Sequence, residues 1–237
     1  MKRLFAALPP ARMKKYFLFL NFLSPLFLCA QDSLDAKFAR SACNCFGTGK
    51  DWYTSGDFRA CFEKVMQENS AGIIAACKKM YGDTSKASAL KYGDELWGRL
   101  SITMISSCDI YYHSIDSLRY VDLEKLDKDS IKKVIMYVST SNKMTGDAPY
   151  FLHRGAMYFE TGNYKKALLD LDNCLKKDST NGQAIFYKAW SLELLKRYDE
   201  AKKLYDSLAK NSGKSEFLIF SAIVERKKKE DPMLKPR

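Results

Sequence analysis

The chain has 237 residues, of which 46% are hydrophobic and 28% are charged, and this is the composition of a folded protein with one or two domains. It excludes a fully disordered chain, a polytopic membrane protein and a collagen-like repeat. Only two histidines are present, His113 and His153, which argues against His-based catalysis and against most zinc sites. The net charge is +11, and its meaning depends on where the basic residues lie.

Residues 1–30 have the organisation of a secretory signal peptide. Five Lys and Arg residues precede an uncharged run, 16–30, that ends in Leu28-Cys29-Ala30. A basic region, an apolar region and a small-residue ending are typical of a cleavable signal. The run is short for a membrane-spanning helix, which needs roughly twenty residues. We therefore expect cleavage after Ala30 and export to the periplasm, the cell envelope or the medium, with no integral span in the mature chain.

Two alternatives for the leader stay open. One is lipidation at Cys29, although Leu28 stands where the lipid-modification motif has a small residue. The other is an uncleaved anchor. The start is also open, because Met13 followed by Lys14-Lys15 makes a complete signal by itself and can replace Met1 as the first residue.

The basic residues are unevenly distributed along the chain. Residues 1–30 hold five basic and no acidic residues, 31–147 hold sixteen of each, and 148–237 hold eighteen basic and twelve acidic. Without the leader the net charge is 34 − 28 = +6, and all of it lies in 148–237. An exported protein rarely meets nucleic acid, so we expect no nucleic-acid partner. The basic run Arg226–Lys229 is either a solvated helix face or a site of weak contact with an anionic surface.

Two stretches of the C-terminal third are related by a constant spacing. Tyr164-Lys165-Lys166-Ala167 recurs as Tyr198-Asp199-Glu200-Ala201, and the same spacing takes Gly155 to Ala189. Small residues at these places let paired helices approach closely, while large residues three and four positions away fill the same face. The pattern predicts an all-α region with helices over about 148–160, 164–177, 183–195, 198–210 and 215–229.

This pattern resembles the tetratricopeptide repeat (TPR), and the match is close at Arg154-Gly155 and at Gly162-Asn163-Tyr164. In the second unit Lys196 replaces the mid-repeat glycine. The resemblance covers about 148–229 and implies a short array of helical hairpins. We expect two repeats, a capping helix or partial third repeat, and a tail, over 148–181, 182–214, 215–230 and 231–237. Two repeats are too few for a stable array, so a helix near 129–140, within the connecting segment 116–147, should pack on the first repeat.

The resemblance also implies a binding surface. TPR arrays usually bind peptides or protein segments along the concave face formed by the first helix of each unit. In this register the concave positions are Leu152, Ala156, Phe159, Glu160, Gln183, Phe186, Trp190 and Leu194. The aromatic members would form a wall for an apolar anchor on a protein or peptide partner. Alternatively, these side chains pack against the upstream helices or the cap.

Five cysteines lie in residues 31–110, and so many in an exported stretch favour disulfides. Cys61 and Cys108 fall on apolar stripes of helical spacing, the latter with Leu90, Trp97, Leu100 and Met104. We expect Cys43 or Cys45 to pair with Cys61 or Cys108, which would brace a small helical module over 31–115. That module is weakly similar to uncharacterised exported bacterial proteins. Cys174, at a repeat position normally filled by a small buried residue, is expected to be a buried free thiol.

The Cys43-Asn44-Cys45 pair supports a second hypothesis, a thiol-disulfide or soft-metal-handling protein. However, the pair falls at the expected end of a helix, where the dipole opposes a thiolate, and no further soft ligands follow at metal-site spacing.

We find no phosphate loop, nucleophile elbow or zinc-protease motif, and we expect no catalytic residue, no metal and no cofactor. Asp170 and Asp172 point apart on a helix and are expected to form a solvated face. His113 and His153 are expected at the surface. The sequence thus favours a non-catalytic interaction or scaffold protein of a bacterial cell envelope or extracellular space.

Overall fold

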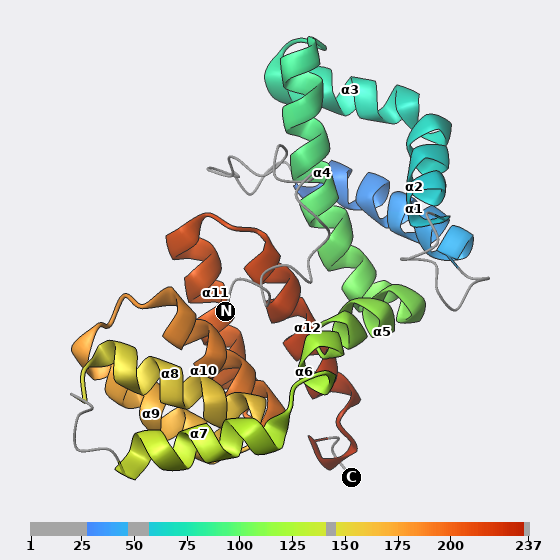
Figure 1. The fold of residues 1–237 in the computed structure, drawn as a ribbon. Helices are drawn as coiled ribbons and strands as arrows, with labels where there is room; N and C mark the ends of the chain where they lie inside the picture. Colours follow the sequence, from blue (N-terminus) through green and yellow to red (C-terminus); the bar gives the residue numbers. More distant parts are fainter. Residues whose placement is uncertain (1–27, 47–56, 141–145, 235–237) are drawn as a thin grey trace. The chain divides into compact units, whose positions relative to one another are not determined.

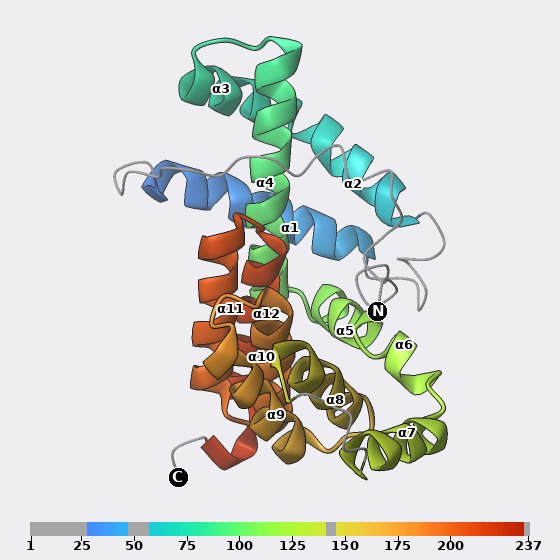
Figure 2. The same ribbon diagram turned by 60° about the vertical axis from the view of Figure 1, so that its left-hand side comes forward.

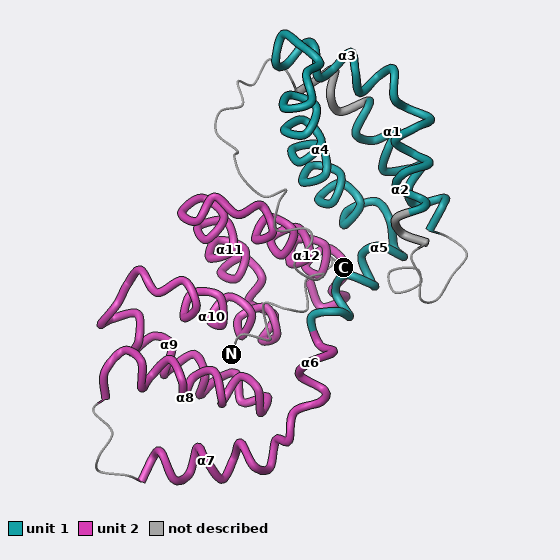
Figure 3. The backbone as a smooth tube through the Cα atoms, turned by 45° about the horizontal axis from the view of Figure 1, so that its top comes forward, with its two compact units in different colours: residues 1–119 teal, residues 120–237 magenta. Residues whose placement is uncertain are grey.

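The computed structural model describes residues 28–46, 57–140 and 146–234 (Figure 1). The chain divides into two compact units, residues 1–119 and 120–237 (Figure 3). All the elements in the described ranges are helical, which confirms the predicted all-α fold. The predicted leader and the choice between Met1 and Met13 fall mainly on 1–27, outside the described residues. The predicted boundaries of the leader, the helical module, the connecting segment and the repeats stay predictions.

The first unit is built around one long helix. Its helices are α1 (Leu28–Phe46), α2 (Asp57–Glu68), α3 (Ser70–Tyr81), α4 (Lys86–Ser107) and α5 (Asp109–Leu118). Helix α4 packs against α1, α3 and α5 (Figure 2). It begins after Ser85, whose hydroxyl accepts a hydrogen bond from the backbone N–H of Ser88 and so satisfies one free donor at the helix start. It ends where Cys108 adopts an extended conformation.

The apolar stripe predicted on α4 is wrong at its first position. Leu90 is 47% exposed, whereas Tyr92 and Leu96 are fully buried. The reason is geometric: two residues correspond to about 200° of rotation, so Leu90 and Tyr92 lie on opposite faces of the helix. The buried stripe of α4 runs through Tyr92, Leu96 and Leu100.

Two disulfides cross-link the first unit, one between Cys43 and Cys108 and one between Cys45 and Cys61. The Cα atoms of each pair are 5.7 Å apart, a normal separation for a disulfide. This confirms the predicted bracing and gives the connectivity that sequence left open. Among the described side chains of this unit, Cys77 forms no disulfide and is buried. Cys174 is also buried and free, as predicted.

The second unit is a row of antiparallel helix pairs. Its elements are α6 (Val121–Glu124), α7 (Lys128–Thr140), α8 (Ala148–Glu160), α9 (Tyr164–Lys177), α10 (Gly182–Leu194), α11 (Tyr198–Ser212), α12 (Glu216–Glu230) and a 3-10 turn, Pro232–Leu234. Helices α8 and α9 form one hairpin, and α10 and α11 form the next (Figures 1 and 2). Helix α7 packs on α8, and α12 packs on α11. The helices predicted for this region are confirmed to within two residues at each end.

Side-chain caps explain where these helices start. Asp147 accepts a hydrogen bond from the N–H of Tyr150 at 2.9 Å and begins α8. In the same way Asn163 accepts a hydrogen bond from the N–H of Lys166 at 3.3 Å and begins α9, and Asn181 accepts one from the N–H of Ala184 at 3.0 Å and begins α10. These residues satisfy N–H groups that have no partner within the helix.

Small residues allow the close helix pairing that the repeat pattern predicted. Ala167, Ala189 and Ala201 are completely buried. A Cβ atom added to Gly155 would lie only 3.0 Å from Cγ of Leu171, so α8 and α9 meet here with no room for a methyl group. The constant spacing of small residues is therefore a packing requirement of each hairpin.

Candidate partner-binding surface

Aromatic side chains form a continuous cluster across the first helices of the repeats. The ring of Trp190 on α10 lies 4.8 Å from that of Phe159 on α8 and 5.8 Å from that of Phe186, centroid to centroid. Phe186 in turn contacts Phe220 of α12 at 5.6 Å. Such contacts add to the free energy gained by burying the rings themselves. The cluster of Phe159, Phe186, Trp190 and Phe220 joins α8, α10 and α12 and is called the aromatic layer below.

The six residues predicted to bind a partner differ in accessibility. Phe159 and Trp190 are 1% and 3% exposed, so they form the buried part of this layer. Glu160, Gln183, Phe186 and Leu194 are partly exposed. A partner-binding role for all six stays a prediction. The accessible four are the positions that a partner could touch without any rearrangement.

Tyr120 packs on this layer from the start of the second unit. Its ring meets that of Trp190 edge-on, with the centroids 5.8 Å apart. Part of the predicted concave face is therefore covered by the chain's own upstream residues, in line with the alternative that the sequence left open. Trp190 would become available to a partner only if Tyr120 moved.

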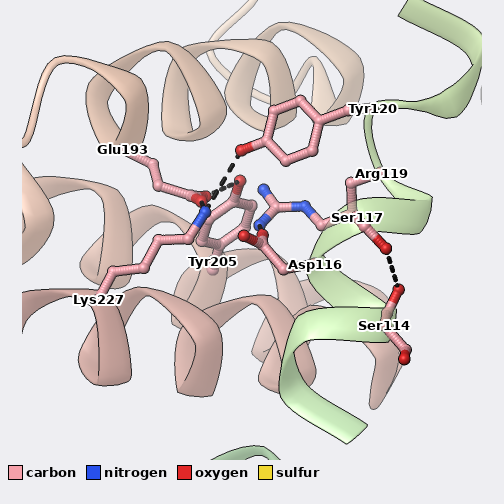
Figure 4. Close-up of polar contacts among 8 residues, drawn as sticks. All are labelled: Ser114, Asp116, Ser117, Arg119, Tyr120, Glu193, Tyr205 and Lys227. Atoms are coloured by element: carbon pink, nitrogen blue, oxygen red, sulfur yellow. Dashed lines mark hydrogen bonds and ion pairs between the residues drawn. The ribbon is translucent and has the colours of Figure 1, made fainter. Parts of the chain in front are cut away.

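A buried carboxylate lies near Tyr120 (Figure 4). Glu193 of α10 is 3% exposed. It accepts hydrogen bonds from the ammonium group of Lys227 at 2.9 Å and from the hydroxyl of Tyr205 at 3.2 Å. Lys227 also donates to the hydroxyl of Tyr120 at 3.3 Å, with its nitrogen 5.6 Å from the centre of that ring. The network ties α10, α11 and α12 to the residue that covers Trp190.

Sequence reasoning missed Glu193. Its signal is an acidic residue within the otherwise apolar or neutral stretch Ala189–Leu195. Such a residue needs a partner, because an unpaired buried carboxylate is costly. The partner, Lys227, belongs to a distant basic run of the sequence, and only the packing of α12 identifies it.

The prediction of a solvated acidic face is wrong for Asp170. This residue is 4% exposed and accepts two hydrogen bonds from the guanidinium of Arg154, at 2.6 and 2.7 Å. The reason is the close approach at Gly155, which brings α9 against the residue preceding that glycine. Asp172 faces elsewhere and pairs with Lys188 at 2.6 Å. The two carboxylates thus brace separate helix contacts.

The basic run of α12 forms ion pairs within its own unit. Arg226 and Lys229 pair with Glu230 and Glu225 along the helix, at 2.7 and 3.0 Å. Lys228 reaches Asp199 of α11 at 2.6 Å, and Lys227 reaches Glu193. Weak contact of this run with an anionic surface stays a prediction, and these local carboxylates compete with it.

Lys196 has the same backbone role as the mid-repeat glycine that it replaces. Its φ is 60°, and Gly162, at the equivalent position of the first repeat, has a φ of 82°. Left-handed backbone is unfavourable for a residue with a side chain. Here the ammonium group of Lys196 lies 3.0 Å from Asp231, which also accepts hydrogen bonds from Tyr198 and from the backbone of Met233. The Met233 N–H and then the Lys196 charge lower the pKa of Asp231.

Burial changes the ionisation of two groups at the edge of the aromatic layer. Burial raises the pKa of Glu160. It also raises the pKa of Tyr187 to about 12, with the charge of Glu160 adding to the effect. A partly buried acid therefore lies at the accessible margin of the layer.

His113 on α5 and His153 on α8 are both exposed, as predicted. Cys43 and Cys45 lie in the last turn of α1, and each is bonded to a different distant cysteine. Within the described ranges there is no group of three or more His, Cys, Asp or Glu side chains placed to hold a metal. The described helices also include none long and apolar enough to cross a bilayer.

Comparison with known proteins bears on the second hairpin. A family model described as the tetratricopeptide repeat matches residues 183–215, which span α10, α11 and the turn before α12. No curated protein and no solved structure matches the chain. The match supports the predicted resemblance for the second repeat and indicates a protein-interaction scaffold.

Proposed function

We propose that this protein is a non-catalytic interaction protein that binds a protein or peptide partner along the first helices of its repeats. The observation that carries the proposal is the pair of helix hairpins, α8–α9 and α10–α11, of which the second matches the tetratricopeptide repeat. Arrays of this kind present an extended helical surface to other proteins. The accessible residues of that surface are Glu160, Gln183, Phe186 and Leu194.

The same proposal places the protein outside the cytosol, in a bacterial periplasm, in the cell envelope or in the medium. Two disulfides in the first unit support this location, because such bonds persist in oxidising compartments. The apolar, uncharged run 16–30 behind a basic segment supports it independently.

The test is cross-linking in intact cells, followed by identification of partners captured with the full chain. Substituting Trp190 would remove a buried ring and could unfold the unit. The variant of choice is therefore Gln183→Lys, which alters a partly exposed position at the start of α10. We expect a partner that is captured reproducibly by the unaltered chain and lost with Gln183→Lys.

The matched control is Asn173→Lys on α9, a partly exposed amide-to-lysine change on a second helix of the array. It should leave capture intact. Equal capture by both variants would contradict binding along the first helices. A tagged chain that remains in the cytosol of its native host would contradict the proposed location.

A further inference from the structure

A groove lies between the second helices of the two repeats. It has a volume of about 480 Å³, within the range of roughly 300–1,000 Å³ of known ligand pockets. Helices α9 and α11 both pack on α10, which leaves α10 as the floor between them. The lining residues are Lys165, Leu168, Leu169, Asp172, Lys188, Leu192, Leu195, Arg197 and Glu200.

The groove has an aliphatic interior that reaches the surface. Leu168 of α9 and Leu192 of α10 are buried, whereas Leu195 is partly exposed. Leu169 lies at the edge and is 66% exposed, although its neighbours Leu168 and Leu171 on the same helix are buried. Covering Leu169 with an aliphatic side chain would remove apolar surface from water on both partners.

The edge of the groove carries more positive than negative groups. Lys188 pairs with Asp172 at 2.6 Å, and Arg197 pairs with Glu200 through two hydrogen bonds of 2.6 and 2.7 Å. Lys165 is exposed, and no carboxylate among the described residues pairs with it. The groove thus has three cations and two anions, and its remaining positive charge is at the first turn of α9.

The wider surroundings have the same sign. Residues 148–237 hold eighteen basic and twelve acidic residues, a net charge of +6. A positive field over this region speeds the approach of an acidic partner and disfavours a basic one.

We propose that this groove is a second docking site, which binds an acidic, leucine-containing peptide segment of a partner protein. An aliphatic side chain of the peptide covers Leu169 and Leu195, and a neighbouring carboxylate pairs with Lys165. The site shares the proposed role in protein interaction, but it lies between α9 and α11 on another face of α10 and uses none of the residues of the aromatic layer.

The test uses three synthetic peptides added to the full chain with isotope-labelled leucine methyl groups. The first is Ser-Glu-Leu-Leu-Glu-Gly, the second replaces both Glu by Lys, and the third replaces both Leu by Ser. We expect the first peptide to shift the methyl signals of Leu169 and Leu195, and the other two to leave them in place. Absence of these shifts at millimolar concentrations of the first peptide would overturn the proposal.

Two neighbouring charge reversals separate specific pairing from general attraction. Lys165→Glu and Lys166→Glu change the net charge equally and lie in the same turn, but only Lys165 lines the groove. We expect Lys165→Glu to weaken binding about fivefold or more and Lys166→Glu to change it less than about twofold. Equal weakening by both, or no weakening by either, would overturn the assigned contact.

The result of the peptide test is independent of the aromatic layer. Methyl shifts that appear only at Leu194, on the aromatic layer, would overturn the groove while leaving the proposed function intact. If the Gln183→Lys variant captures a partner as well as the unaltered chain does, the proposed surface on the first helices is contradicted. The peptide experiment would still test the groove.

Discussion

The ammonium group of Lys227 lies 2.9 Å from the carboxylate of Glu193, and this ion pair joins α12 to α10 beside the aromatic layer. The Glu193 side chain is 1% exposed and that of Lys227 is 18% exposed. A carboxylate so buried keeps the cost of its lost hydration when its cation is removed. Helix α12 is therefore held by an electrostatic contact as well as by apolar packing.

Lys227→Met should lower the free energy of unfolding by about 2–4 kcal/mol, because it leaves Glu193 charged and buried. Urea denaturation followed by circular dichroism measures the loss. Lys228→Met is the matched control: it is adjacent, it removes the same charge, and its ion pair with Asp199 is solvent-exposed. Its effect should stay below about 1 kcal/mol. Similar losses for both variants would contradict a special role for the buried pair.

Gly162→Ala should destabilise the first hairpin by about 1–2 kcal/mol, because its φ of 82° is unfavourable for any residue with a Cβ atom. Thermal unfolding of the full chain provides the measurement. Gly182→Ala is the comparison: this glycine is the first residue of α10, its φ is not positive, and an added Cβ would make only an ordinary contact at 3.8 Å with Leu208. We expect Gly182→Ala to be neutral or slightly stabilising. A stabilising Gly162→Ala would refute this account.

Alkaline pH should destabilise the second unit through Tyr187. Its pKa is about 12 in the folded chain, against about 10 for an unfolded tyrosine. The folded state therefore holds the proton of Tyr187 more tightly than the unfolded state does. The contribution of Tyr187 to the free energy of unfolding is complete below pH 10 and is lost as the pH rises towards 12. The expected loss is about 1.4 kcal/mol at pH 11 and approaches about 2.7 kcal/mol above pH 12. Unfolding free energies at pH 9, 10 and 11 measure it.

Tyr187→Phe should flatten this alkaline dependence, because phenylalanine has no proton to lose. Tyr137→Phe, which alters an exposed tyrosine on α7, serves as the control and should leave the profile unchanged. An identical profile for the unaltered chain and Tyr187→Phe would show that Tyr187 does not carry the effect.

Counting thiols tests the disulfides and the leader together. Alkylation in denaturant without reductant should label Cys77 and Cys174, giving two additions in a chain that starts after Ala30 and three in a chain that keeps an unmodified Cys29. Without denaturant, both buried thiols should be protected. Prior reduction should add four further labels. Intact-mass spectrometry counts the labels on each chain. More than two labels before reduction, or more than three in a chain that keeps Cys29, would rule out the two disulfides.

The sequence by itself determined the helical fold of the repeats. Gly155, Ala167, Ala189 and Ala201 fix where helices can touch, and Asp147, Asn163 and Asn181 fix where helices begin. These signals are local, since a helix cap or a small residue at fixed spacing acts within one hairpin. The general pairing of Cys43 and Cys45 with Cys61 and Cys108 also followed from helical spacing.

Only the tertiary structure decided which polar side chains are buried and which part of the binding surface is open. Asp170 and Glu193 are of a residue type that usually lies at the surface, and their burial depends on cations, Arg154 and Lys227, that other helices supply. Tyr120 covers Trp190 because two segments distant in sequence meet. The groove at Leu169 likewise exists because α9 and α11 share α10 as their floor. Contacts between distant segments leave no periodic signal, so sequence patterns cannot reveal them.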